Sequence, residues 1–109
     1  MGGIPELLDQ LEDAQKWGRR HPATFAVPNP ADLATLRTGD CVKICRCGER
    51  FWVQITHLEG EVLEGAVNNE LVLEGNAELL LGTLVVFEKR HVYDISRRTP
   101  PQFGAEGTA

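Results

Sequence analysis

All three cysteines of the chain lie close together, as Cys41-x3-Cys45-x-Cys47. Thiolates bind zinc, and a structural zinc site needs four Cys or His ligands, usually from two short knuckles. The segment has the pattern of a β-strand, on which Cys41 and Cys45 lie about 13 Å apart, too far to share a metal ion. Cys45 and Cys47, about 7 Å apart, would chelate a metal only with help from His57 or His91. We therefore expect cysteines that fill space in the fold, with no metal and no cofactor.

The histidines raise the question of acid–base chemistry. The sequence contains no HExxH motif, no nucleophile elbow and no glycine-rich phosphate loop. We therefore expect no catalytic residue. One alternative stays open, a small hydrolase-like or metal-binding domain with His21, His91, Trp52 and either Glu49 or Asp94 in one cleft.

The cysteines belong to a predicted β-hairpin that follows a turn over 38–40. Apolar residues alternate along its two strands, at Val42 and Ile44 on the first and at Phe51, Val53 and Ile55 on the second. A period of two is typical of strands with one buried face. We place the turn between the two strands at Gly48-Glu49.

Trp52 lies on the second strand of this hairpin and points away from its apolar face. In one interpretation the N-terminal helix or the segment around Phe25 covers it. In the other it is exposed and marks a contact surface, as tryptophan often does. Of the two, we favour burial.

Further segments complete the fold. Apolar residues recur at helical spacing over 4–17, with acids on the opposite side, which predicts an amphipathic helix. Short strands are expected near 61–67, 84–87 and 92–95, with an extended run at 71–73. Five or so strands after one helix predict an α+β fold, in which an N-terminal helix packs on a small curled antiparallel sheet or SH3-like open barrel.

A chain of 109 residues has the length of one domain. We expect a single domain over 1–96, with its β core over 39–95, and a flexible C-terminal tail over 97–109 that is rich in Pro, Gly and small residues. No apolar run approaches the roughly 18 residues that cross a bilayer, and the N-terminus lacks a signal-peptide pattern. Together with an odd number of closely spaced cysteines, this predicts reduced thiols in the cytoplasm.

The charge of the chain limits its partners. A formal net charge of −5 argues against nucleic-acid binding, because that depends on neutralising phosphates, and we expect no membrane association. Residues 57–88 contain seven glutamates and neither Lys nor Arg, which suits a basic protein partner. We therefore predict a non-enzymatic binding or protein-interaction module, a monomer or weak dimer, whose partner the sequence does not identify.

Short motifs along residues 21–95 carry a family resemblance. In chain order they are His21-Pro22-x-Thr24-Phe25, Leu36-x-x-Gly39-Asp40-x-Val42-Lys43-Ile44, Glu49-Arg50-x-Trp52-Val53-x-Ile55, Gly65-x-Val67-x-Asn69, Gly82-x-x-Val85-x-Phe87 and His91-Val92-x-Asp94. On these motifs the chain resembles the YegJ-like family of small bacterial domains of unknown function. The resemblance implies a fold and a cytosolic setting, and it implies no reaction.

The chain departs from the family pattern at several points. Family members have a longer insertion before the Glu-Arg-x-Trp element, Gly-Asp in place of Gly82-Thr83, and a proline in place of Leu71. None of the three cysteines belongs to the pattern, which argues further against a metal site. The polar and aromatic members of the pattern are predicted to form a binding cleft if they converge, and to support turns and ion pairs if they scatter: His21, Thr24, Glu49, Arg50, Trp52, Asn69, His91 and Asp94.

Overall fold

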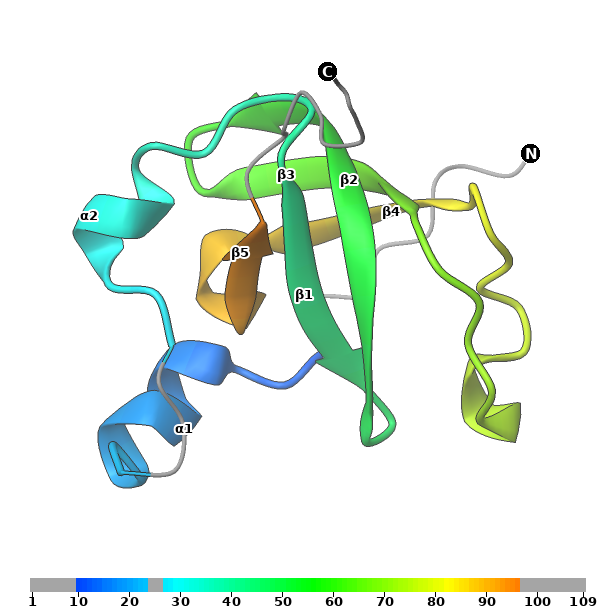
Figure 1. Cartoon of the computed structure of the whole chain (residues 1–109), viewed down its shortest axis with the longest axis horizontal. Helices are drawn as coiled ribbons and strands as arrows, with labels where there is room; N and C mark the ends of the chain where they lie inside the picture. The colour runs from blue at the N-terminus through cyan, green and yellow to red at the C-terminus, as the bar shows by residue number, and fades with distance from the viewer. Residues whose placement is uncertain (1–9, 24–26, 97–109) are drawn as a thin grey trace, which may run out of the picture.

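The computed structural model describes residues 10–23 and 27–96, which form a short helical segment followed by one sheet (Figure 1). The elements in chain order are α1 (Ala14–Arg20), α2 (Pro30–Leu33), β1 (Cys41–Arg46), β2 (Glu49–Glu59), β3 (Val62–Val67), the 3₁₀ turn η1 (Glu74–Asn76), β4 (Leu84–Glu88), the 3₁₀ turn η2 (Lys89–His91) and β5 (Asp94–Ser96). The strands pair antiparallel in the order β4-β3-β2-β1-β5. The sheet is curled and open, so the predicted α+β fold with a curled antiparallel sheet is confirmed, and no closed barrel forms. The predicted tail over 97–109 lies outside the described residues.

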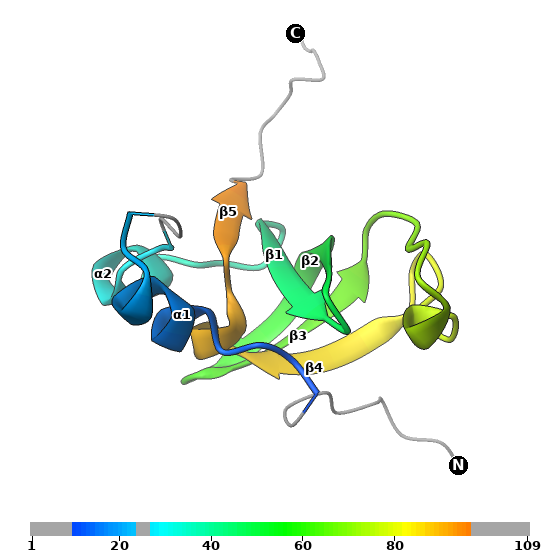
Figure 2. The same ribbon diagram turned by 90° about the horizontal axis from the view of Figure 1, so that it is seen from below.

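The core lies inside the curl of the sheet. The alternating apolar residues of the predicted hairpin are all buried there, as expected from their period: Val42, Ile44, Phe51, Val53 and Ile55. Val85 and Phe87 of β4 join the same core, together with Leu33 from α2. β1 and β4 are not neighbours in the sheet, yet both contribute to this core. They do so because the curl carries β3 and β4 across β1 and β2 (Figure 2).

The turn between β1 and β2 differs by one residue from the prediction. Arg46 pairs with Glu49, which leaves Cys47 and Gly48 as a two-residue loop. Both loop residues have positive φ, 53° for Cys47 and 79° for Gly48, as a type I′ hairpin turn requires. Glu49 therefore belongs to β2, and the predicted turn at Gly48-Glu49 is wrong by one position.

β2 bends where its pairing with β3 shifts, between Ile55 and His57. Gly65 of β3 lies at this bend. A Cβ atom on Gly65 would be 2.7 Å from the carbonyl oxygen of Gln54 and would also overlap Val53. The glycine therefore permits the close approach of the two strands at the bend.

The N-terminal helix is shorter than predicted and begins later in the chain. Within the predicted range of 4–17, residues 10–13 are not helical, and the earlier part lies outside the described residues. Leu11 instead forms an isolated antiparallel bridge with Arg46 at the end of β1. Asp13 is the N-cap of α1 and accepts a hydrogen bond from the first turn. The leucine spacing fits a helix, but Leu11 enters the core with extended backbone.

No helix within the described ranges is long and apolar enough to span a bilayer.

Candidate functional site

The outer face of the sheet, opposite the core, carries three of the predicted binding residues, Arg50, Trp52 and Asp94. Lys43 of β1 pairs with Trp52 of β2 on one side and with Asp94 of β5 on the other, so Lys43, Trp52 and Asp94 form a row across the sheet. The Lys43 ammonium lies 4.9 Å from the centre of the Trp52 ring, a cation–π contact. Trp52 is half-buried, so it is neither fully covered nor fully exposed, and its state lies between the two interpretations of the sequence. Arg50 lies two residues before Trp52 and therefore on the same face.

A cluster around Tyr93 adjoins this row, and the sequence did not predict it. The Arg50 guanidinium lies 4.4 Å from the centre of the Tyr93 ring, and the Tyr93 hydroxyl donates a hydrogen bond of 2.8 Å to the Glu12 carboxylate. Cys45 is buried beside them, and its burial together with the Glu12 carboxylate raises the pKa of its thiol to about 11. This thiol is protonated near neutral pH, so it is poorly suited to nucleophilic attack.

The other two cysteines are free thiols, Cys41 half-buried and Cys47 exposed. Burial raises the pKa of the Cys41 thiol above its ordinary value. Across residues 10–23 and 27–96, no group of three His, Cys, Asp or Glu side chains is arranged to hold a metal ion. The described part of the chain therefore offers no ligand set on which a metal site can be argued.

The two histidines predicted as binding residues lie in different surroundings. His91 of η2 is fully buried, and its Nδ1 atom accepts a hydrogen bond of 2.9 Å from the backbone N–H of Glu88. It thereby stabilises the one-turn link from β4 to β5. His21 is exposed after α1, and its ring stacks on Trp17 with 5.6 Å between the ring centres. His91 is buried whereas Trp52 lies on the outer face, so these two residues of the alternative His/Glu/Trp cleft do not line one surface cleft.

Glu49 and Asn69 support the long loop that connects β3 to β4, the β3–β4 loop. The Glu49 carboxylate accepts hydrogen bonds from the backbone N–H groups of Val72 at 2.7 Å and Leu73 at 2.9 Å. These bonds hold the pKa of Glu49 below its ordinary value, and the bond from Val72 has the largest effect. The Asn69 side chain accepts a hydrogen bond of 2.6 Å from the backbone N–H of Trp52. Both residues therefore fix the loop against β2 rather than line a cleft.

A buried polar network also fixes the β3–β4 loop to the sheet, and the sequence did not predict this network. Asn76 is 1% exposed, and its amide donates to the carbonyl oxygen of Arg46 at 3.0 Å and to Glu49 at 3.1 Å. The Arg46 guanidinium is also largely buried and contacts Glu78 at 2.8 Å and Gln10 at 2.8 Å. The network joins the N-terminal segment, the β1–β2 hairpin and the β3–β4 loop.

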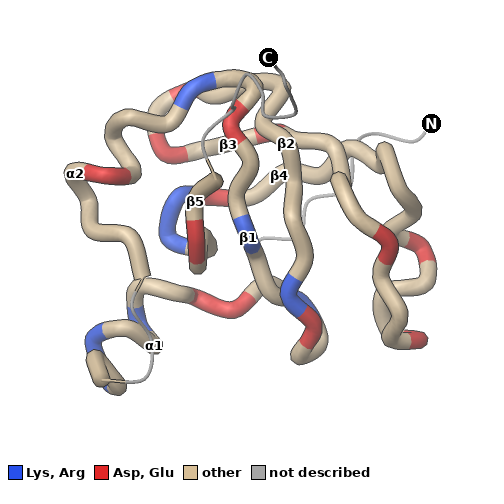
Figure 3. Tube along the Cα trace, viewed as in Figure 1, with Lys and Arg blue, Asp and Glu red and all other residues tan. Residues whose placement is uncertain are grey.

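The supported loop presents apolar side chains to solvent. Val72 is 84% exposed, Leu80 67% and Leu81 61%. A groove of about 370 Å³ runs along the loop, and we call it the leucine groove, defined by its lining residues Glu70, Leu71, Asn76, Ala77, Leu79, Leu80 and Leu81. The charged positions of the loop are all acidic (Figure 3). The sequence indicates the acidity of this segment but not the exposure of its leucines.

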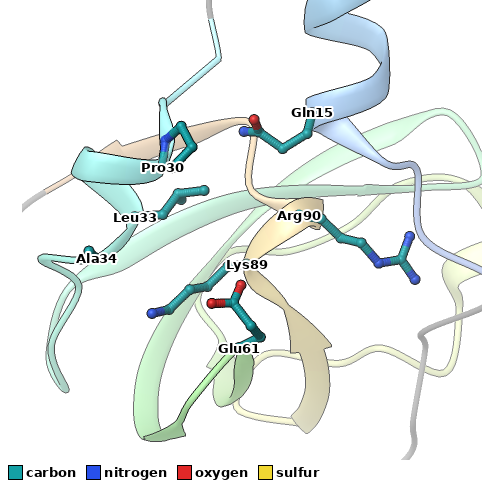
Figure 4. Close-up of a pocket in the computed structure, with 7 residues that line it drawn as sticks. All are labelled: Gln15, Pro30, Leu33, Ala34, Glu61, Lys89 and Arg90. Carbon is teal, nitrogen blue, oxygen red and sulfur yellow. The ribbon is translucent and has the colours of Figure 1, made fainter.

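A smaller cleft of about 180 Å³ lies between the helices and η2 (Figure 4), lined by Gln15, Pro30, Leu33, Ala34, Glu61, Lys89 and Arg90. Two of its polar side chains already have partners. Arg90 binds Glu88 at 2.6 Å and Asp13 at 3.2 Å, and Gln15 donates to the carbonyl oxygen of Pro28 at 2.7 Å. The cleft is also smaller than the roughly 300 Å³ of typical ligand pockets, so the leucine groove is the better candidate site.

Comparison with known proteins leaves the function to be inferred from this geometry. No protein-family model matches the chain, and no curated protein or solved structure matches it significantly. Membership of the YegJ-like family stays a prediction.

Proposed function

We propose that the protein is a non-enzymatic protein-interaction module that binds its partner through the leucine groove. The observation that carries the proposal is the exposure of Leu80 and Leu81, at 67% and 61%, at the rim of this groove. Exposed apolar side chains that gather around a hollow commonly mark a protein-binding surface. The three free cysteines suit a reducing setting such as the cytoplasm.

The support beneath the groove favours binding. Glu49 holds the backbone of Val72 and Leu73, and buried Asn76 joins the loop to β1. A loop that is already fixed in place loses little conformational entropy when a partner docks, which leaves more of the contact free energy for affinity. Because Glu49 and Asn76 hold the loop in place, their presence needs no catalytic explanation.

The outer face of the sheet is a weaker candidate for the contact. Its only tryptophan among the described strands, Trp52, is half-buried and already contacts the ammonium of Lys43. Arg50 is likewise stacked on Tyr93. A partner docking there would have to displace these contacts, whereas Leu80 and Leu81 are exposed without rearrangement.

Site-specific photo-crosslinking in the cells that produce the protein tests this proposal. A benzophenone amino acid replaces Leu80 in one variant and Val62 in a matched control, because Val62 is also apolar and 43% exposed but begins β3 at the end opposite the loop. We expect a discrete protein adduct from the Leu80 variant and none from the control. Equal adducts from both variants, or adducts only from the control, would contradict the proposal.

A further inference from the structure

The charges around the leucine groove restrict what it can bind. Glu70 lines the groove, and exposed Glu74 begins η1, two residues before the lining residue Asn76; neither carboxylate forms an ion pair with a described basic side chain. Glu78 lies between two lining residues and has its partner in buried Arg46. The surrounding stretch, 57–88, contains no Lys or Arg. The groove therefore carries leucine side chains on its wall beside polar groups, and negative charge at its edge.

A second copy of this chain is poorly suited to occupy the groove. In a two-fold symmetric dimer the same patch faces itself, so Glu70 and Glu74 of one copy would meet the same residues of the other. Like charges opposed at an interface cost free energy unless basic groups intervene. The β3–β4 loop supplies no such groups, because its charged residues are all glutamates.

We propose, as a deepening of the proposed function and resting on it, that the partner is a protein segment that is both apolar and basic. Its apolar side chains fill the groove between Leu71, Leu80 and Leu81, and its Lys or Arg side chains pair with Glu70 and Glu74. An amphipathic helix with leucines at every third or fourth position and lysines between them has this chemistry. Nucleic acids and anionic lipid surfaces lack it, since they would oppose the glutamates with negative charge.

Binding of a defined peptide to the full-length protein tests whether apolar side chains of the partner contact the groove. The probe is a fluorescein-labelled helical peptide of leucine and lysine, measured by fluorescence anisotropy, and its controls replace either all lysines by glutamate or all leucines by serine. We expect binding of the Leu/Lys peptide alone. Replacing Leu80 and Leu81 by serine should weaken it about tenfold or more, whereas Val62→Ser, which also removes an exposed apolar side chain, should leave the affinity unchanged.

The ionic part needs a control for net charge, because any acidic protein attracts a cationic peptide. Glu70→Gln with Glu74→Gln removes two charges at the groove, and Glu59→Gln with Glu61→Gln removes two charges at the exposed turn between β2 and β3. We expect the first pair to weaken binding about three- to tenfold at low salt and to abolish most of its salt dependence. The second pair should have little effect.

The outcomes separate this inference from the proposed function. Equal effects of the two glutamine pairs, or equal binding of the glutamate peptide, would overturn a basic partner. A concentration-dependent dimer that Leu81→Ser abolishes in sedimentation would overturn it in favour of self-association. In either case a photo-crosslink at Leu80 would still support an interaction module with a different partner, whereas loss of that crosslink would remove the proposed function as well.

Discussion

Asn76 is the residue whose loss should most clearly show that the β3–β4 loop is fixed to the sheet. Replacing it by alanine removes a hydrogen bond of 3.0 Å to the buried carbonyl of Arg46, and it leaves the buried Arg46 guanidinium without the Asn76 oxygen that accepts from it at 3.4 Å. A neutral hydrogen bond contributes about 1 kcal/mol net, and an unsatisfied buried group costs about 1–3 kcal/mol. We expect Asn76→Ala to lower the free energy of unfolding by about 2–3 kcal/mol. The partly buried bond to Glu49 is left out of this sum because solvent partly screens it.

Urea denaturation followed by circular dichroism measures the loss. Asn68→Ala is the matched control, because Asn68 is exposed and its side chain makes only a long contact of 3.6 Å to the Cys41 sulfur. That control should change the free energy of unfolding by no more than about 0.5 kcal/mol. Amide exchange should also quicken at Val72 and Leu73 in the Asn76 variant. If Asn76→Ala is no less stable than Asn68→Ala, the network does not fix the loop as the hydrogen bonds indicate.

Other perturbations test separate parts of the structure. The fold lowers the pKa of Glu49, so its contribution to stability is present above the unfolded-state pKa and is lost as the pH falls through the lower folded value. The urea midpoint should therefore fall less steeply below about pH 4 in Glu49→Gln than in the parent protein, and equal slopes would refute this. Iodoacetamide near neutral pH should alkylate exposed Cys47 but spare Cys45, which is buried and whose thiol pKa is about 11. Cys45 should react once denaturant is added. Equal labelling of the two cysteines in the folded protein, found by peptide mapping, would refute the buried environment of Cys45.

The hairpin shows how much of the fold the sequence determines. The alternation of Val42 and Ile44 predicts which face is buried, because side chains on a strand alternate strictly. The row from Lys43 to Trp52 depends in addition on register, which the two-residue turn fixes. Placing the turn one residue late, at Gly48-Glu49, hides that pairing. With the turn at its observed position, the pairing of Lys43 with Trp52, and with it the contact of the Lys43 side chain with the Trp52 ring, could have been predicted.

The N-terminal segment and the loop network depend on contacts that local pattern does not encode. Leu11 has the spacing of a helical residue, yet its backbone bridges to Arg46 at the end of β1. Arg46 and Asn76 bind one another across 30 residues of chain, and nothing near either residue in the sequence points to the other. One signal was present, since Arg46 continues the buried alternation of β1 and a buried arginine requires partners.

The candidate site divides in the same way between pattern and packing. The acidity of residues 57–88 is evident in the sequence. In the run from Leu79 to Leu81, however, only Leu79 is buried, at 2% exposed, while the next two leucines face solvent. Without helical or strand periodicity in this loop, no rule from the sequence separates the buried leucine from the exposed ones.

Photo-crosslinking from the leucine groove is the measurement that bears most directly on the proposed function. With the benzophenone group in place of Leu80, we predict one discrete protein adduct in the producing cells, which the Glu70→Gln and Glu74→Gln changes diminish. The same group in place of Trp52 or Val62 should give none, since neither residue lines the groove. An adduct that forms from Trp52 and not from Leu80 would place the binding surface on the outer face of the sheet and contradict the assignment to the groove.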